Sequence, residues 1–405
     1  MNERGWLYLL FKPVAVVCKP KKLVALYFYF VSYAHVCIGY FVENRLKPKE
    51  KNRVLHKKLG WLIVIVMLAG LLLAACAPAA TPAQSNATTT QVKAEPVAQS
   101  KGAGGAGVRE ICIIGGADAF FAVVKNGADA AGAAVVAAGS HYTWIPLPNY
   151  DNIGPDMVKL IEQAVAQKCT GLAVPVWDGA AEGPAIKAAV DKGINVFMYN
   201  SGLPLLQDGS VPAHGYFGTD EHEAGLAAGK AFVAHGSKHL ICVNTQPGAV
   251  NWQQRCGGAI EAAKAGGMKA EELTLPAENF GNAAAISAAV QAKLTADPTI
   301  DAVVNGSAAD SDAVAETLSS LGVVDKVALG SWDVSKNILD RIASGKQVFA
   351  VDQQGWLQGW YAVSHTWFYD QYAILPATNV ILTGPALITK DNVATVQLAV
   401  GSGQR

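Results

Sequence analysis

The sequence predicts an α/β protein with two doubly wound domains. From residue 111 onward, short β-type runs alternate with alanine-rich helical stretches. Strands that alternate with helices of about 10–15 residues are typical of parallel sheets covered by helices on both faces. About ten such strands are predicted, more than one sheet comfortably holds. The chain has 405 residues and is 51% hydrophobic, so it can bury two cores.

The predicted elements fall into two series. The first consists of strands at 111–116, 142–147, 172–176 and 196–199, with helices near 119–138, 152–168 and 180–192. The second begins with a helix at 222–235. It continues with strands at 240–244, 302–305, 327–332 and 348–351, a helix at 250–265, and a helical stretch after each of the last three strands. In open parallel sheets ligands bind beyond the carboxyl ends of the strands, so the residues that follow each strand are the candidates for a site.

A basic block followed by an apolar run predicts an export signal. Residues 1–58 carry a net charge of +9, and residues 59–405 carry −9, which argues against a nucleic-acid partner. Residues 54–75 combine basic side chains with an uncharged run over 59–75, as in a signal peptide. The run ends in Leu-Ala-Ala-Cys, which resembles the lipobox of bacterial lipoproteins, so Cys76 is the expected lipidation site. The alternative is a transmembrane anchor with an incidental cysteine.

The segments on either side of the signal carry no expected fold. Residues 1–53 contain a second apolar run over 23–42, and two spanning runs would conflict with the positive-inside rule. We therefore expect an over-called start, with translation beginning near Val54 or Leu55. Residues 76–107 are rich in Ala, Thr, Pro, Gln and Gly and predict a flexible tether behind the lipidated cysteine.

The residues that follow the predicted strands favour a site for polar, ring-shaped solutes. Carboxylates, carboxamides and one arginine gather there together with aromatic rings. Hydroxyls take hydrogen bonds from such groups, while the C–H face of a sugar packs on aromatic rings, and arginine adds a rigid fork of donors. The candidates are Asp118, Phe120, Phe121, Asn200, Arg255, Asp310, Asp333 and Gln353.

Five motifs give the globular part a resemblance to a known family. They are IIGGADAFF at 113–121, FGTDEHEAGLAAG at 217–229, QQRCGG at 253–258, GSWD at 330–333 and DQQGWLQG at 352–359. Over about 110–400 the chain resembles the periplasmic sugar-binding proteins of the ribose/galactose type, which are solute receptors of ABC importers. The resemblance implies the type 1 fold, in which two Rossmann-like lobes joined by three crossovers close on the ligand like a hinged trap. The expected lobes are 108–218 plus 353–386 and 219–352 plus 387–400, with crossovers near 218–220, 351–354 and 385–387.

The resemblance also implies roles for individual residues. Phe120 and Phe121 match the family's aromatic pair, and Asp118 matches the polar residue that precedes it. Arg255 matches the arginine that grips the sugar oxygens, and Asp333 matches the aspartate that ends a strand. Gln353 matches the polar residue at the last crossover, and Phe280 matches an aromatic residue of the second lobe. Two positions depart from the ribose-binding pattern: Asn200 and Ser201 replace an Asp-Arg pair, and the loop from Ser307 to Asp310 replaces an Asn-Asp pair. Pentoses, hexoses, polyols and furanone-type signals all remain open as ligands.

Four cysteines remain for an oxidising compartment once the leader cysteines and Cys76 are set aside. Cys112 opens the first strand and Cys169 precedes the third, and these strands should be neighbours in a doubly wound sheet. Cys242 lies in a strand, and Cys256 directly follows Arg255. We predict the disulfides Cys112–Cys169 and Cys242–Cys256, each contributing about 3–4 kcal/mol; the alternative is four buried thiols. No metal site is expected, because no CxxC or HxxxH pair shares a helix with them.

Together these features predict an exported, lipid-anchored solute-binding protein. It would capture a sugar or sugar-like polyol between two lobes and deliver it to an ABC permease in the cytoplasmic membrane, as a monomer and without a cofactor. One alternative is a receptor that passes its signal to a chemotaxis or sensor-kinase partner. The enzyme alternative is glycoside hydrolysis by cleft carboxylates, but nothing in the sequence singles out an acid–nucleophile pair, so we expect no catalysis.

Overall fold

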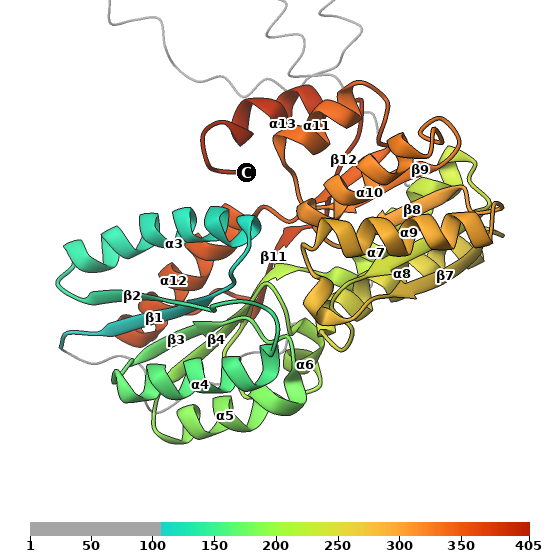
Figure 1. The fold of residues 1–405 in the computed structure, drawn as a ribbon. Helices are drawn as coiled ribbons and strands as arrows, with labels where there is room; N and C mark the ends of the chain where they lie inside the picture. Colours follow the sequence, from blue (N-terminus) through green and yellow to red (C-terminus); the bar gives the residue numbers. More distant parts are fainter. Residues whose placement is uncertain (1–106) are drawn as a thin grey trace, which may run out of the picture. The chain divides into compact units, whose positions relative to one another are not determined.

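Two six-stranded sheets organise the described part of the chain, residues 107–405, in this computed structural model (Figure 1). The predicted leader 1–53, signal peptide 54–75, lipidation site Cys76 and all but the last residue of the tether 76–107 lie outside the described residues. The strand order is β11-β5-β4-β3-β1-β2 in the first sheet and β12-β10-β9-β8-β6-β7 in the second. The predicted fold class, two doubly wound α/β units, is confirmed.

The first sheet and its helices are called here the N-terminal lobe. All its neighbouring strands pair in parallel. Its strands are β1 (Glu110–Gly115), β2 (His141–Pro146), β3 (Gly171–Val174), β4 (Asn195–Tyr199), β5 (Tyr216–Thr219) and β11 (Val380–Gly384). Helices α3 (Ala119–Ala137) and α12 (Gly355–Tyr372) pack together on one face, and α4 (Ile153–Ala166) and α5 (Gly179–Asp191) pack on the other, with the short α6 (Leu203–Gln207) after β4 (Figure 1).

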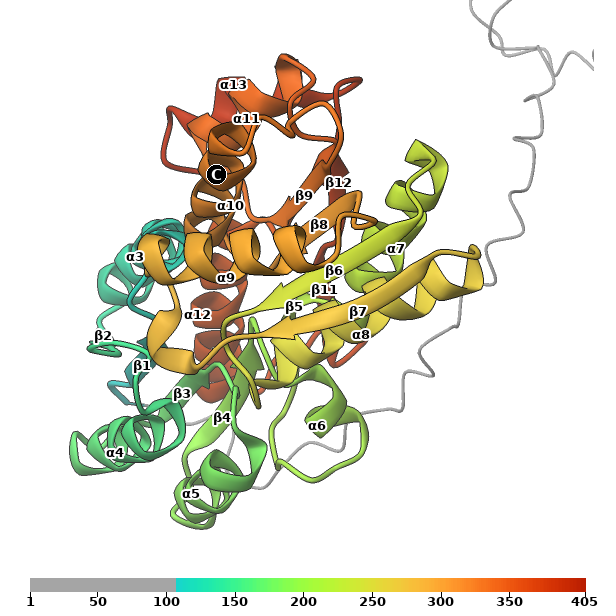
Figure 2. The same cartoon turned by 45° about the vertical axis from the view of Figure 1, so that its right-hand side comes forward.

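The second sheet and its helices are called the C-terminal lobe. Its strands are β6 (His239–Asn244), β7 (Lys269–Thr274), β8 (Ala302–Asn305), β9 (Ala328–Trp332), β10 (Phe349–Asp352) and the antiparallel edge strand β12 (Ala386–Ile388). Helices α7 (Glu221–His235) and α8 (Val250–Ala265) cover one face, and α9 (Ala283–Ala296) and α10 (Ala308–Ser320) cover the other (Figure 2). Helices α11 (Lys336–Ala343) and α13 (Val393–Val400) pack together beside β10 and β12, and a 3₁₀ turn (Ala277–Asn279) precedes α9.

The residues of β6 show how this sheet holds two cores. Leu240 and Cys242 pack toward α7 and α8, whereas Ile241 and Val243 pack toward α9 and α10. Successive side chains of a strand point to opposite faces, so a continuous apolar run buries both.

The chain passes between the lobes three times. It leaves the first sheet after β5 to form α7, returns after β10 to form α12, and crosses again between β11 and β12. These passages place the carboxyl ends of strands from both sheets around one cleft.

One helix pair in each lobe crosses at glycines. A Cβ atom on Gly359 of α12 would lie 2.1 Å from the backbone oxygen of Val124 in α3, and one on Gly258 of α8 would lie 2.4 Å from that of His222 in α7. Among the described helices, α3 is the one whose length and hydropathy would also fit a membrane span. Its buried face packs on β1, β2 and α12, as expected for a core helix.

The cysteines pair as predicted. The Cα atoms are 5.9 Å apart in Cys112–Cys169 and 5.5 Å apart in Cys242–Cys256, both at disulfide distance. The second pair joins β6 to α8 and so ties down the helix turn that carries Arg255.

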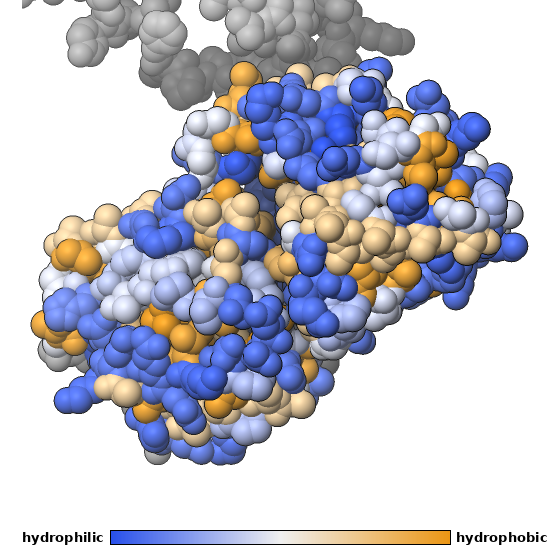
Figure 3. Space-filling view, in the orientation of Figure 1, coloured by the Kyte–Doolittle hydropathy of each residue, from blue (hydrophilic) through white to orange (hydrophobic). Residues whose placement is uncertain are grey.

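Several elements of the structure were not predicted. Strand β7 and helices α6, α9 and α13 were missed. Strands β5, β11 and β12 were also missed, because the sequence predicted only the crossovers next to them. Helix α9 exposes a row of alanines that forms a weakly apolar band on an otherwise largely hydrophilic face (Figure 3). Only Ile286 and Val290 of this helix are buried, so its sequence lacks a clear apolar stripe.

Candidate functional site

The candidate site is a pocket between the two lobes, at the carboxyl ends of their strands. Seventeen residues line it, and they enclose about 410 Å³ of space not filled by atoms, part of it open to solvent. The N-terminal lobe contributes residues that follow β1, β2, β3 and β4, and the C-terminal lobe contributes residues that follow β6, β7, β8, β9 and β10.

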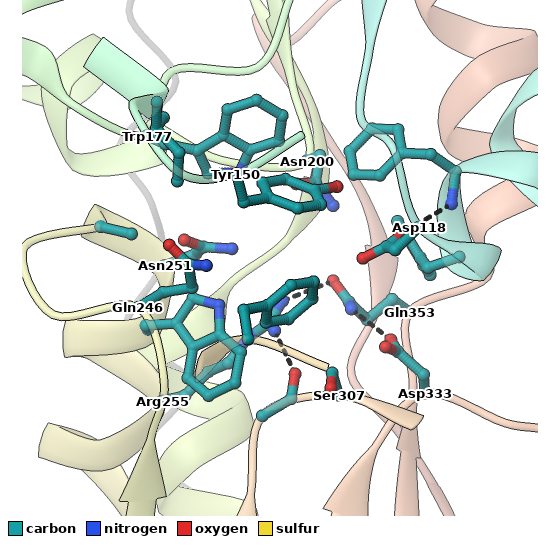
Figure 4. A pocket seen from close by; sticks show the side chains of 17 residues that line it. Asp118, Tyr150, Trp177, Asn200, Gln246, Asn251, Arg255, Ser307, Asp333 and Gln353 are labelled. Atoms are coloured by element: carbon teal, nitrogen blue, oxygen red, sulfur yellow. Dashed lines mark hydrogen bonds between the residues drawn. The ribbon is translucent and has the colours of Figure 1, made fainter. Parts of the chain in front are cut away.

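Asp118 reaches the pocket from the start of α3. Its Oδ1 accepts the backbone N–H of Phe121 at 3.1 Å and so caps the helix. The carboxylate also lines the pocket (Figure 4), where the Tyr150 side chain forms a hydrogen bond with it. The geometry of Asp118 therefore allows both helix capping and contact with a ligand.

Arg255 reaches the pocket from α8, and other protein groups hold its guanidinium. Its Nε and Nη2 donate to the two carboxylate oxygens of Glu221 at 2.8 and 2.6 Å, and its Nη1 donates to the backbone oxygen of Gly306 at 2.7 Å. Nη2 also donates to Oε1 of Gln353 at 3.0 Å. Arg255 and Glu221 are both almost fully buried. The arginine is therefore fixed in one orientation and keeps little free donor capacity.

Gln353 links this arginine to a carboxylate of the C-terminal lobe. Its Nε2 donates to Oδ1 of Asp333 at 2.6 Å. Asp333 follows β9 with a left-handed backbone (φ 66°), and Asn200 follows β4 in the same conformation (φ 62°). Asp and Asn tolerate this conformation better than other non-glycine residues. In both strands the sharp turn directs the side chain into the pocket.

Aromatic rings form the walls of the pocket. Phe120, Phe121, Tyr150 and Trp177 come from the N-terminal lobe, and Trp252 and Phe280 come from the C-terminal lobe. The ring centroids of Tyr150 and Phe280 lie 4.8 Å apart in an edge-to-face contact that spans the two lobes. The backbone N–H of Val250 donates across the same gap to the backbone oxygen of Trp177 at 2.9 Å. The lobes are therefore in direct contact around the pocket.

Two carboxamides with unmet hydrogen bonds face Asp118 from the opposite side of the pocket (Figure 4). Gln246 and Asn251 are each about 95% buried. Nε2 of Gln246 and Oδ1 of Asn251 have no hydrogen-bond partner among the described residues. A buried donor or acceptor without a partner costs about 1–3 kcal/mol, so these groups suit a ligand that supplies both an acceptor and a donor.

Burial changes the protonation of the pocket carboxyls. It raises the pKa of Asp333 to about 7, although the Arg255 guanidinium opposes the rise. Burial likewise raises the pKa of Asp118, against hydrogen bonds from the Phe121 N–H and the Tyr150 side chain. A carboxyl poised near neutrality can accept a hydrogen bond when ionised and donate one when protonated.

The structure brings eight of the nine sequence-predicted ligand residues into one pocket. Asp310 does not line it: its Oδ2 accepts the Thr245 hydroxyl at 2.7 Å, and its Oδ1 accepts the Gly281 N–H at 3.3 Å. Its carboxylate therefore holds the neighbouring loops at Thr245 and Gly281. The lining residues are Asp118, Phe120, Phe121, Asn200, Arg255, Phe280, Asp333 and Gln353.

Four important lining residues escaped the sequence analysis: Tyr150, Trp177, Gln246 and Asn251. The first three each lie within a few residues of the end of a predicted strand, which is the rule that identified the other candidates. Asn251 lies in the first turn of α8, one turn before Arg255, and like Arg255 it is buried.

Within residues 107–405, one cluster away from the pocket has metal-ligand chemistry. His239, Glu271 and Asp297 lie at the amino ends of β6 and β7 and after α9. Both ring nitrogens of His239 already have partners, Thr299 Oγ1 at 2.9 Å and Glu271 Oε1 at 3.1 Å, and Lys293 pairs with Glu271 at 2.7 Å. These hydrogen bonds and the ion pair join the cluster into a network in which both nitrogens of His239 have a protein partner.

Comparisons with known proteins agree with this geometry. A family model described as a periplasmic binding protein domain matches residues 111–368. The xylose/arabinose-binding protein XylF of Sulfolobus acidocaldarius is 25% identical over 281 residues, which cover 64% of this chain and 66% of that protein.

Solved structures show the same architecture. A carbohydrate transporter from Acidothermus cellulolyticus 11B, in complex with myo-inositol, is 29% identical with a TM-score of 0.65, and the match covers 74% of this chain and 100% of that one. An ABC transporter solute-binding protein from Burkholderia graminis C4D1M, in complex with D-arabinose, is 25% identical with a TM-score of 0.62, over 71% and 97% of the two chains.

Proposed function

The chain belongs to the periplasmic binding protein family, and we propose that it captures a sugar or sugar-like polyol between its two lobes and delivers it to an ABC permease. The proteins of this family are binding proteins and not enzymes, and their location is extracytoplasmic.

The observation that carries the ligand class is the combination of unmet polar groups and aromatic walls in one pocket. Gln246 and Asn251 present an unpaired donor and an unpaired acceptor, while Asp118 and Asp333 offer carboxyl oxygens at the other end. A ring bearing several hydroxyls supplies partners to all of them and packs its C–H faces on the aromatic rings. The myo-inositol and D-arabinose bound by the two similar proteins belong to this chemical class.

Closure of the lobes completes the site. The lining residues are divided between two sheets that the chain joins only at its three crossovers. A ligand that contacts both lobes binds the closed arrangement better than an open one and so shifts the population toward closure. The proposed lobes are residues 108–218 with 353–386 and residues 219–352 with 387–400, and the proposed anchor is lipidated Cys76 behind the tether 76–107.

A ligand screen by thermal unfolding tests the proposed function. The panel is myo-inositol, D-xylose, D-arabinose, D-galactose, D-glucose and mannitol, each added in excess to the protein. A ligand that binds only the folded state raises the melting temperature. At one hundred times its Kd it adds about 2.7 kcal/mol to the free energy of unfolding. We expect one member to give a clear shift; silence across the panel would contradict the proposed ligand class.

A matched pair of variants then ties the shift to the pocket. Gln246→Leu removes a buried side chain whose Nε2 lacks a protein partner, so the free protein should melt no lower than wild type while the ligand-induced shift falls. Gln163→Leu makes the same change on an exposed position of α4 and should leave the ligand-induced shift unaltered. Equal shifts in both variants would place the ligand elsewhere.

Import is tested in cells. Deleting the gene should abolish uptake of the ligand found in the screen if the chain serves a permease. Unchanged uptake, with loss of a ligand-dependent response, would favour the chemotaxis or sensor-kinase role.

A further inference from the structure

The pairing of Arg255 with Glu221 indicates which charge a ligand can have. This inference rests on the proposed sugar-binding function. We propose that Glu221 is a specificity-determining residue: by occupying the guanidinium of Arg255, it restricts the pocket to uncharged polyols and excludes sugar acids and sugar phosphates.

The hydrogen bonds of Arg255 leave it little to offer a ligand. A guanidinium has five N–H donors. The contacts to Glu221, Gly306 and Gln353 account for four of them. An unpaired arginine would present a two-pronged fork that matches a carboxylate or phosphate. Here the Nε–Nη2 edge of that fork already faces a carboxylate of the protein.

Glu221 is itself held in place. It is the first residue of α7, directly after the crossover from β5, and its helix is capped by Asp220. Its Oε2 accepts the indole N–H of Trp332 at 3.1 Å in addition to Arg255. With 2% of its surface exposed, the carboxylate has no alternative partner in solvent. The pairing is therefore a fixed feature of the closed pocket.

The remaining charges of the pocket are negative. In the part of the chain that the structure describes, Arg255 is the only cationic residue among those lining the pocket, whereas Asp118 and Asp333 are both acidic. Glu221 cancels the charge of the arginine, so nothing offsets the two aspartates. Whenever these aspartates are ionised, an anionic ligand would meet like charges in a water-poor site, which costs several kcal/mol, and in either protonation state it would find no free cation. An uncharged hydroxyl can donate to either aspartate.

The test compares uncharged ligands with their anionic counterparts. The pairs are D-glucose with D-glucuronate, D-galactose with D-galacturonate, and myo-inositol with myo-inositol 1-phosphate, titrated calorimetrically into wild type and Glu221→Gln. Wild type should bind one uncharged member and reject its anionic counterpart by roughly 100-fold or more. In Glu221→Gln, which frees the edge of the arginine fork, that ratio should fall at least tenfold, with a gain in affinity for the anion.

Two further variants separate the effect of the Arg255–Glu221 ion pair from the effect of the pocket's net charge. Asp333→Asn also removes one negative charge but leaves Arg255 paired, and Glu221→Asp keeps the charge on a shorter side chain. A gain for the anion confined to Glu221→Gln supports the inference. The inference is overturned by an equal gain in Asp333→Asn, by unchanged rejection in Glu221→Gln, or by wild type that binds both members of a pair alike. Wild type that binds no member of any pair would instead refute the proposed function.

A measurement on wild type covers the case in which Glu221→Gln does not fold. The Nε–H proton of Arg255, assigned in NMR spectra by its loss in Arg255→Lys, should be protected from solvent exchange with and without the uncharged ligand. Rapid exchange of this proton in the ligand-bound protein would show that Glu221 does not hold the arginine.

Discussion

Glu182 is a fully buried carboxyl that holds the loop presenting Trp177 to the pocket. Its Oε1 accepts the backbone N–H groups of Trp177 and Asp178 at 2.9 and 2.8 Å, while its Oε2 has no hydrogen-bond partner among the described residues. The same loop receives the hydrogen bond from Val250 of the other lobe. One buried side chain therefore supports both a wall of the pocket and a contact between the lobes.

Replacing this carboxyl should make stability less sensitive to high pH. Burial raises the pKa of Glu182 from 4.5 to about 8, so the folded state binds the proton more tightly than the unfolded state. The resulting stability is fully present below pH 4.5 and is lost as the pH rises through about 8. Glu182→Gln keeps the acceptor and cannot ionise. It should match wild type near pH 4 and exceed it by roughly 4–5 kcal/mol above pH 8, measured by urea unfolding.

Other titrating groups are common to both proteins, so the difference between them isolates Glu182. Parallel curves of unfolding free energy against pH for wild type and variant would contradict a raised pKa at this residue.

The roles of individual site residues were only partly predictable from the sequence. Strand ends and motif positions identified the residues that reach the pocket, because the chain order determines which strands end together. They did not reveal that Glu221 forms an ion pair with the Arg255 guanidinium, or that Asp310 accepts a hydrogen bond from Thr245 instead of lining the pocket. Those outcomes depend on side-chain contacts between segments 34 and 65 residues apart.

Helices α7 and α8 show how element packing rests on the smallest side chains. Gly258 faces α7, where an added Cβ would meet the backbone oxygen of His222 at 2.4 Å, whereas its neighbour Gly257 has nothing within 4 Å. Both lie inside α8 and have the same intrinsic cost in a helix. Their difference is therefore one of packing alone.

This pair allows a controlled test of the helix crossing. Gly258→Ala should lower the free energy of unfolding by about 1–3 kcal/mol, because the backbone of α7 must move to admit the methyl group. Gly257→Ala should raise it by up to about 1 kcal/mol through helix propensity. Denaturant unfolding of the two variants measures both effects. A similar response of the two variants would mean that α7 and α8 do not cross at Gly258.

At the scale of elements, the sequence pattern predicted most of the buried strands, although it missed the buried but short β5 and found the largely unburied β2. Strands β1, β3, β4, β6 and β8 are buried along most or all of their length and were predicted. Edge strand β7 has three charged residues among its six and was missed, as was the alanine-rich α9. Strands β11 and β12 are short and gain their partners only from distant parts of the chain, which a local pattern does not encode.

At the scale of the whole molecule, the chain order explains why a single pocket draws on both lobes. Each sheet is built largely from one continuous half of the sequence, but β11 and α12 return to the first sheet after the second is nearly complete. The crossover after β10 carries Gln353, which contacts Arg255 and Asp333 in the C-terminal lobe, directly before the helix that packs on the N-terminal lobe. Ligand binding and lobe arrangement are therefore coupled through the same few residues.

The central claim, that one solute is held by both lobes at once, is tested most directly by calorimetric titration of two isosteric variants. Asp118→Asn alters the N-terminal lobe while keeping a good helix cap, and Asp333→Asn alters the C-terminal lobe. Asp325→Asn, at an exposed position of the C-terminal lobe, is the control. With the ligand found in the thermal screen, wild type and the control should bind one molecule per chain with equal affinity, and each pocket variant should bind about tenfold or more weakly. Weakening by only one of the two pocket variants, or by neither, would contradict a ligand shared between the lobes.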